Sequence, residues 1–101
     1  MAVTKQYLKS KPVCRVRFAV PKSLSQGASE VSVVGDFNNW DPKQHPMYAL
    51  KKGGFSACID LVPGQRYEFR YVLDGHIWIN EAEADELVAT PFGSENSVLD
   101  L

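Results

Sequence analysis

The chain has 101 residues and a formal net charge of −1, with 45% hydrophobic and 23% charged residues. This length corresponds to a single domain, and the composition is that of a folded globular chain rather than a disordered one. The charge balance lacks the surplus of Lys and Arg that neutralises phosphates, and no apolar run is long enough to cross a bilayer, so nucleic acid and membrane partners are excluded.

The amino-terminal segment contains lysines but no apolar stretch of signal-peptide length, which predicts a cytoplasmic protein with an N-terminal extension over 1–11 and a domain over 12–101. Cys14 and Cys58 are far apart, and both fall in strand-like segments. We therefore expect reduced, buried thiols, with a disulfide between them as the alternative. Neither histidine stands at zinc-ligand spacing with a cysteine, so no metal and no cofactor are expected.

The dominant pattern along the chain is an alternation of apolar and polar residues, which is typical of half-buried strands. Turn residues such as Asp-Pro, Gly-Gly, Pro-Gly and Asp-Gly separate these segments. The segment 80–87 has room for a single helical turn, and no long helix is expected. About seven strands, without a helix between them, predict an all-β antiparallel sandwich. The predicted strands are 13–20, 30–34, 47–50, 55–61, 67–73, 77–79 and 97–101.

The Asp-Gly dipeptide in the second half of the chain predicts a hairpin whose register depends on the loop length. Only an odd number of loop residues keeps the apolar residues of both strands on the core side, because successive side chains point to opposite faces. A three-residue loop over 73–75 pairs Tyr71 with Ile77. In that register Arg70 lies directly across from Trp78 on the outer face of the sheet.

Four side chains suit a neutral, polyhydroxylated ligand if they share one face: Trp40, Arg70, Trp78 and Asn96. Aromatic faces cover the C–H side of a sugar ring, and guanidinium and carboxamide groups exchange hydrogen bonds with hydroxyls. Structural alternatives stay open for each residue. Trp40 could cap the open end of the sandwich, and a loop over 80–90 could cover Trp78. Arg70 could form a stacked surface pair with Trp78, and Asn96 could stabilise a turn.

The acidic run Glu81, Glu83, Asp85 and Glu86 is the one candidate for catalytic carboxylates. Glycoside hydrolysis needs two carboxyl groups about 5–10 Å apart in a cleft, which a short loop on a sandwich does not provide. We interpret the run as a solvated loop. No nucleophile lies near a base, and no glycine-rich phosphate loop is present, so the protein is not expected to be an enzyme.

The stretch VSVVGDFNNW over 31–40 resembles the strand-turn signature of family 48 carbohydrate-binding modules, also called isoamylase N-terminal or early-set domains. This family includes the glycogen-binding domain of the β subunit of AMP-activated protein kinase and the N-terminal domains of glycogen branching and debranching enzymes. The resemblance continues through 67–75, Trp78 and 92–98, and it covers roughly 30–101.

The resemblance implies an immunoglobulin-like β-sandwich that binds α-glucans such as glycogen and starch. It also implies positions that contact the glucan. These are the stacking residues Trp40 and Trp78, Arg70 in place of a lysine, Phe92 in place of a leucine, Ser94 in place of a threonine, and Asn96.

Three departures from the family pattern stand out. Trp78 lies one residue further from the Asp-Gly turn than in the kinase domains, the loop over 80–90 is longer and acidic, and no catalytic domain accompanies the module. In the last respect the chain resembles small stand-alone early-set proteins of bacteria. The prediction is a non-catalytic module whose partner is an α-glucan. The alternative is a protein-interaction or regulatory module that docks on a glycogen-metabolism enzyme or kinase through the same face, without sugar.

Overall fold

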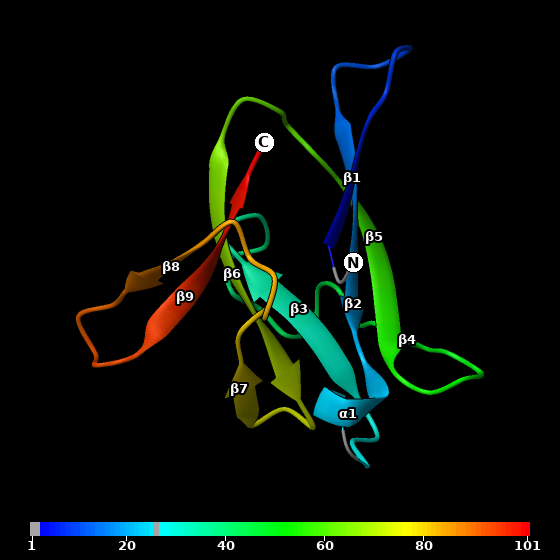
Figure 1. Ribbon diagram of the computed structural model, residues 1–101, viewed down its shortest axis with the longest axis vertical. Coiled ribbons are helices and arrows are strands. Elements are labelled where there is room, and N and C mark those ends of the chain that lie inside the picture. The colour runs from blue at the N-terminus through cyan, green and yellow to red at the C-terminus, as the bar shows by residue number, and fades with distance from the viewer. Residues whose placement is uncertain (1–2, 26) are drawn as a thin grey trace.

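The computed structural model describes residues 3–25 and 27–101. This part of the chain forms two antiparallel sheets that face each other, which confirms the predicted all-β sandwich (Figure 1). It contains nine strands rather than about seven, and one short helix. The elements are β1 (Val3–Tyr7), β2 (Cys14–Val20), α1 (Lys22–Ser25), β3 (Val31–Gly35), β4 (Tyr48–Ala49), β5 (Phe55–Leu61), β6 (Arg66–Leu73), β7 (Ile77–Ile79), β8 (Glu86–Ala89) and β9 (Glu95–Asp100).

The first sheet has the strand order β1-β2-β5-β4, and the second has the order β3-β6-β9-β8, with β7 also paired to β6. On one side of β6, two strands follow each other end to end. β9 pairs with residues 66–69 of β6, and β7 pairs with residues 71–73. Arg70 therefore lies where one partner strand ends and the other begins.

The sequence analysis missed two strands, β1 and β8, and placed the helical turn wrongly. Residues 86–89 form β8 instead of helix, and the helical turn is α1, in a predicted loop. Neither missed strand alternates cleanly: β1 points Lys5 to the inner side, and β8 has three apolar residues in succession. β1 lies inside the predicted extension 1–11 and pairs with β2.

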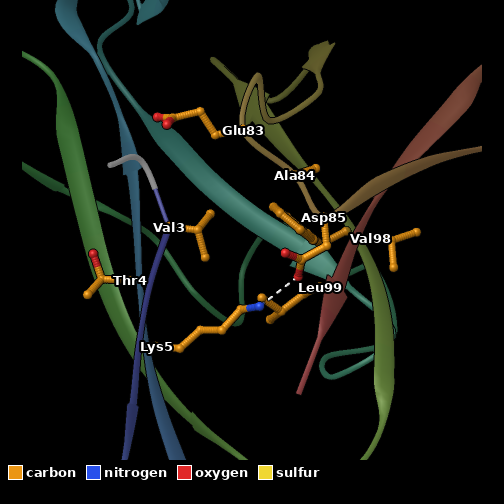
Figure 2. A pocket seen from close by; sticks show the side chains of 9 residues that line it. Val3, Thr4, Lys5, Glu83, Ala84, Asp85, Val98 and Leu99 are labelled. Carbon is orange, nitrogen blue, oxygen red and sulfur yellow. Dashed lines mark hydrogen bonds and ion pairs between the residues drawn. The ribbon is translucent and has the colours of Figure 1, made fainter.

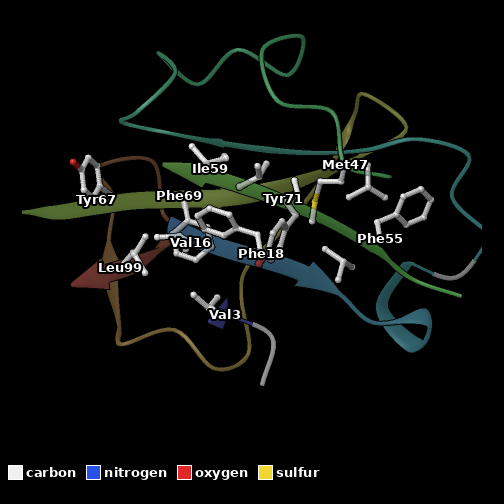
Figure 3. Close-up of a cluster of buried hydrophobic side chains, with 14 of the residues drawn as sticks. Val3, Val16, Phe18, Met47, Phe55, Ile59, Tyr67, Phe69, Tyr71 and Leu99 are labelled. Carbon is white, nitrogen blue, oxygen red and sulfur yellow. The ribbon is translucent and has the colours of Figure 1, made fainter. Parts of the chain in front are cut away.

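The core fills the space between the two sheets with alternate side chains of their central strands (Figure 3). Phe18 of β2 meets Phe69 of β6 edge to face, with ring centroids 5.2 Å apart, and Phe69 meets Tyr71 at 5.8 Å. Edge-to-face pairs of this kind add about 0.5–1.5 kcal/mol each beyond the burial of their area. The core thus holds the sheets together and leaves the outer face of the second sheet available for other contacts.

The two cysteines differ in their environment. Cys14 is buried, as predicted, but Cys58 is exposed, so the prediction of two buried thiols was wrong for Cys58. The strand β5 explains the difference, because it turns Ala57 and Ile59 inward and therefore turns Cys58 outward. Both thiols are free, and the alternative of a disulfide between them is not realised.

The predicted register of the β6–β7 hairpin was wrong by one loop position. The loop has three residues, but it spans 74–76, so Trp78 pairs with Val72 rather than with Arg70. Asp74 starts the loop because its carboxylate accepts hydrogen bonds from the backbone N–H groups of Ser29 and Glu30, at 2.8 and 3.0 Å. Arg70 and Trp78 remain on the same outer face, as diagonal rather than direct neighbours.

The acidic segment between β7 and β8 is not simply a solvated loop. Glu81 is only 4% exposed. Its Oε1 accepts a hydrogen bond of 2.7 Å from the Tyr71 hydroxyl, and its backbone N–H donates to Ser97 Oγ at 2.9 Å. Burial, together with this carboxylate, raises the pKa of Tyr71 well above its usual range. The interpretation of the run as solvated was therefore wrong for Glu81, which anchors the segment against the core.

A second anchor lies further along the same segment, beside a hollow of about 310 Å³ between β1 and β9 (Figure 2). Lys5 Nζ lies 2.7 Å from Asp85 Oδ2 and donates to the Asp100 carbonyl at 2.8 Å. The Asp100 N–H donates to the same carboxylate oxygen at 2.7 Å. Partial burial opposes ionisation of Asp85, but these hydrogen bonds outweigh it and lower the pKa of the carboxyl group.

Replacing Asp85 with Asn should lower the free energy of unfolding at pH 7 by about 1 kcal/mol or less, since a partly exposed ion pair contributes little more. A carboxyl group with a depressed pKa stabilises the fold above its unfolded pKa, near 4, and loses this effect as pH falls through the folded pKa. The difference between the parent and Asp85→Asn should therefore shrink as the pH falls below about 4 in urea unfolding curves.

The matched control is Glu95→Gln, because the Glu95 side chain makes no hydrogen bond or ion pair with another described residue. This variant should keep the stability of the parent at pH 7. A loss in Asp85→Asn that stayed constant down to pH 2 would contradict an electrostatic origin.

Candidate functional site

The turn that follows β3 brings Trp40 to the outer face of the second sheet. A Cβ at Gly35 would lie 2.5 Å from the Glu68 carbonyl oxygen, so only glycine allows β3 to pass this close to β6. The side chain of the buried Asn38 then forms hydrogen bonds with backbone groups at the end of β3. Its Oδ1 accepts from the Gly35 N–H and its Nδ2 donates to the Val33 carbonyl, both at 3.0 Å.

Trp40 itself has an uncommon backbone conformation. Asn39 and Trp40 have φ angles of 55° and 58°, in the left-handed region that bulky residues seldom adopt. The turn holds Trp40 there through a hydrogen bond from its backbone N–H to the Gly35 carbonyl, at 3.0 Å. Its indole Nε1 donates to Asp36 Oδ1 at 3.3 Å. Residues held in such conformations cluster at ligand sites, and this half-buried indole is therefore a candidate contact.

Arg70 is the centre of a hydrogen-bond network on the same face. Its Nε donates to Asn96 Oδ1 at 2.5 Å, and its Nη2 donates to Ser94 Oγ at 2.7 Å. Asn96 Nδ2 donates to Glu68 Oε1 at 3.0 Å, and the hydroxyl groups of Ser94 and Thr90 lie 2.9 Å apart. The guanidinium group is thus oriented by neutral partners, and no described residue accepts a hydrogen bond from its Nη1.

Two exposed aromatic side chains flank this network. Trp78, on β7, is 44% exposed, and Phe92, in the loop between β8 and β9, is 91% exposed. A backbone hydrogen bond of 2.8 Å from Thr90 to Ser94 closes that loop. The loop lies at the end of the β8–β9 hairpin, which projects from the body of the sandwich (Figure 1). A contiguous exposed aromatic surface beside polar groups is typical of a binding site.

The structure brings all six predicted site residues together along one open groove of about 650 Å³. Their roles in binding stay predictions. The groove also includes residues that the sequence analysis did not assign, notably Asp36, Glu68 and Thr90. Strand periodicity could have indicated Glu68, which lies two residues before Arg70 on the same face of β6. The groove residues are Asp36, Trp40, Glu68, Arg70, Trp78, Ala89, Thr90, Pro91, Phe92, Ser94 and Asn96.

The groove differs in chemistry from the hollow beside the Lys5–Asp85 pair. That hollow is smaller, and much of its wall is the apolar surface of residues such as Val3, Phe69 and Leu99. Among the described residues, no group of three or more His, Cys, Asp or Glu side chains could hold a metal ion, and no helix is long and apolar enough to span a membrane. The groove is therefore the candidate site, and its chemistry is hydrogen bonding and stacking.

A β-sandwich that carries an open groove of aromatic and hydrogen-bonding side chains on the outer face of one sheet defines a class of binding modules. The sequence matches the family model of carbohydrate-binding module 48, the isoamylase N-terminal domain, over residues 14–93, and the chain belongs to this family. The resemblance inferred from the strand-turn signature is therefore confirmed.

The chain is also similar to the N-terminal part of several bacterial enzymes. It is 35% identical to the 1,4-alpha-glucan branching enzyme GlgB of Ralstonia nicotianae over 101 residues, which cover 94% of this chain and 13% of the enzyme. It is 48% identical to GlgB of Deinococcus radiodurans over 56 residues, or 54% of this chain and 8% of that enzyme. The chain thus spans 13% or less of these relatives, which are whole enzymes, whereas the matched family is a binding module.

Replacing Asn38 with Ala should lower the free energy of unfolding by about 1–3 kcal/mol, because it leaves buried backbone groups of Gly35 and Val33 without partners. Urea unfolding at pH 7 measures this loss. Asn39→Asp is the matched control, because the neighbouring side chain is exposed and Asp tolerates a positive φ. Equal midpoints for Asn38→Ala and the parent would contradict the assigned role of Asn38 in the turn.

Proposed function

We propose that the chain is a non-catalytic module that binds α-glucan in this groove. In the proposal, Trp40 and Trp78 stack on glucose rings, Arg70 and Asn96 hydrogen-bond to hydroxyl groups, and Phe92 adds an apolar wall beside Ser94. One observation carries the proposal. Six positions from separate segments, four of them selected by their side-chain chemistry and all six implied by the resemblance, line a single groove.

The chemistry of the groove supports a neutral ligand with many hydroxyl groups. The indole of Trp78 is partly exposed, so its apolar face is available to the C–H surface of a sugar ring. The Arg70 Nη1 hydrogens have no partner among the described residues, so they can donate to hydroxyl oxygens. An open groove desolvates few groups, and we expect dissociation constants on the order of micromolar to millimolar.

The relatives support the ligand class. The proteins to which the chain is similar are named for their action on 1,4-alpha-glucan. For this chain we infer only the ligand class, 1,4-alpha-glucan, because the chain corresponds to a small part of those enzymes. The proposal includes the cytoplasmic location expected from the sequence.

A second candidate is protein docking through the same face. Phe92 is 91% exposed, and an uncovered aromatic side chain beside an exposed tryptophan is a potential hot spot for a protein partner such as a glycogen-metabolism enzyme. The polar residues between the aromatics favour sugar, because the centre of a protein interface is usually depleted of charged groups. Sugar titration separates the two candidates.

Titration of the tryptophan fluorescence with maltoheptaose should give a saturable change in the parent. Trp40→Ala and Trp78→Ala should each weaken binding at least about tenfold, equivalent to about 1.4 kcal/mol, because each removes one stacking surface. Tyr48→Ala is the matched control, since Tyr48 is exposed to 73% on the edge strand of the other sheet. No change up to about 10 mM ligand would reject sugar binding and leave protein docking.

Arg70→Lys should weaken maltoheptaose binding about threefold to tenfold although it keeps the charge, because an ammonium group cannot reproduce the planar fork that contacts Asn96 and Ser94. Calorimetric titration measures this change. Arg15→Lys is the control, because Arg15 also forms a fork, with Asp60, but on the other sheet. Equal affinity of Arg70→Lys and the parent would show that the fork makes no contribution.

A further inference from the structure

Two carboxylates in the groove, Asp36 and Glu68, each accept a hydrogen bond from a residue proposed to contact the sugar. Asp36 Oδ1 accepts from Trp40 Nε1 at 3.3 Å, and Glu68 Oε1 accepts from Asn96 Nδ2 at 3.0 Å. The two carboxylates are also connected, because the Glu68 backbone N–H donates to Asp36 Oδ2 at 2.8 Å. Neither residue was assigned a role from the sequence.

Glu68 and Arg70 together determine which way the Asn96 carboxamide points. The carbonyl end accepts from Arg70 Nε, and the amide end donates to Glu68. A rotation of the carboxamide by 180° would place its NH₂ group against the guanidinium and its oxygen against the carboxylate, so both contacts would become repulsive. In the observed orientation, Asn96 keeps one Nδ2 hydrogen and one Oδ1 lone pair for a ligand hydroxyl.

Asp36 acts on Trp40 in a comparable way. Because its carboxylate accepts the indole N–H, that donor is already used, and Trp40 offers a ligand the face of its ring rather than a hydrogen bond. The other carboxylate oxygen binds the backbone of β6. The orientation of the indole is thereby tied to the strand that holds Arg70.

We propose that Asp36 and Glu68 are positioning residues of the groove, which hold the Trp40 ring and the Asn96 carboxamide in their binding orientations before a ligand arrives. This inference rests on the proposed glucan-binding function. Side chains that are ordered in advance lose less conformational entropy on binding, so removing either carboxylate should weaken affinity without removing any group that contacts the sugar.

The first test compares Glu68→Ala with Glu68→Gln. The glutamine oxygen can still accept the hydrogen bond from Asn96 Nδ2, so Glu68→Gln should keep the affinity for maltoheptaose within twofold, whereas Glu68→Ala should weaken it about fivefold to tenfold. In the unliganded protein, the side-chain amide resonances of Asn96 in ¹H–¹⁵N spectra should shift in Glu68→Ala and stay near their parent positions in Glu68→Gln. If Glu68→Ala does not fold, Glu68→Met offers a similar length without a strong acceptor.

Glu86→Ala is the matched control, because Glu86 is also a carboxylate on the second sheet but pairs with Arg66 away from the groove. It should change neither the affinity nor the Asn96 resonances. Asp36 is tested by Asp36→Asn in a Trp78→Phe background, where Trp40 is the only tryptophan. One carboxamide oxygen cannot replace both carboxylate oxygens, so the emission spectrum of Trp40 should shift.

Unchanged affinity in Glu68→Ala, or Asn96 resonances that stay in place, would overturn the role of Glu68 even if the thermal stability fell. An unchanged Trp40 emission spectrum in Asp36→Asn would overturn the role of Asp36. The spectra are recorded without ligand and are therefore independent of the sugar titration. If the parent binds no maltoheptaose, the proposed function fails, and the resonances and the emission spectrum still decide whether the carboxylates orient Asn96 and Trp40.

Discussion

The pairing of β6 with two successive partners, β9 along its first half and β7 along its second, is the constraint on which the groove depends. It places Arg70 at the junction, with Asn96 on one partner strand and Trp78 on the other. The fork of hydrogen bonds from Arg70 to Asn96 and Ser94 then spans this side of the sheet. Each group is carried by a strand or by a short loop, which positions the groove residues without an additional layer of structure.

The apolar core of this small domain and its proposed binding surface are separated in space. The apolar side chains from both sheets pack in the interior, where the ring of Phe69 contacts both Phe18 and Tyr71. The polar network of the groove lies on the other side of β6, where it is only partly buried. Alternation along one strand therefore lets a single segment contribute Phe69 to the core and Arg70 to the groove. Substitutions on the groove face can change binding with little effect on the core.

The acidic segment between β7 and β8 has a structural role. Glu81 is buried against Tyr71, and Asp85 pairs with Lys5 of the edge strand β1, so the segment is held against the core and β1. It is thereby held away from the groove, none of whose lining residues belongs to it. The groove remains open, as the proposed binding of a long polymer would require.

The sequence by itself determined the sandwich, most of its strands and six of the eleven residues that line the groove, because alternation and turn chemistry are local and the resemblance is carried by short contiguous motifs. Only the tertiary structure decided the register of the β6–β7 hairpin, the burial of Glu81 and the hydrogen bonds of Asp36 and Glu68. Each depends on partners distant in the chain, such as the backbone of Ser29 and Glu30 that holds Asp74, or Asn96 that meets Glu68. A pattern in one strand cannot specify which atoms another strand will place beside it.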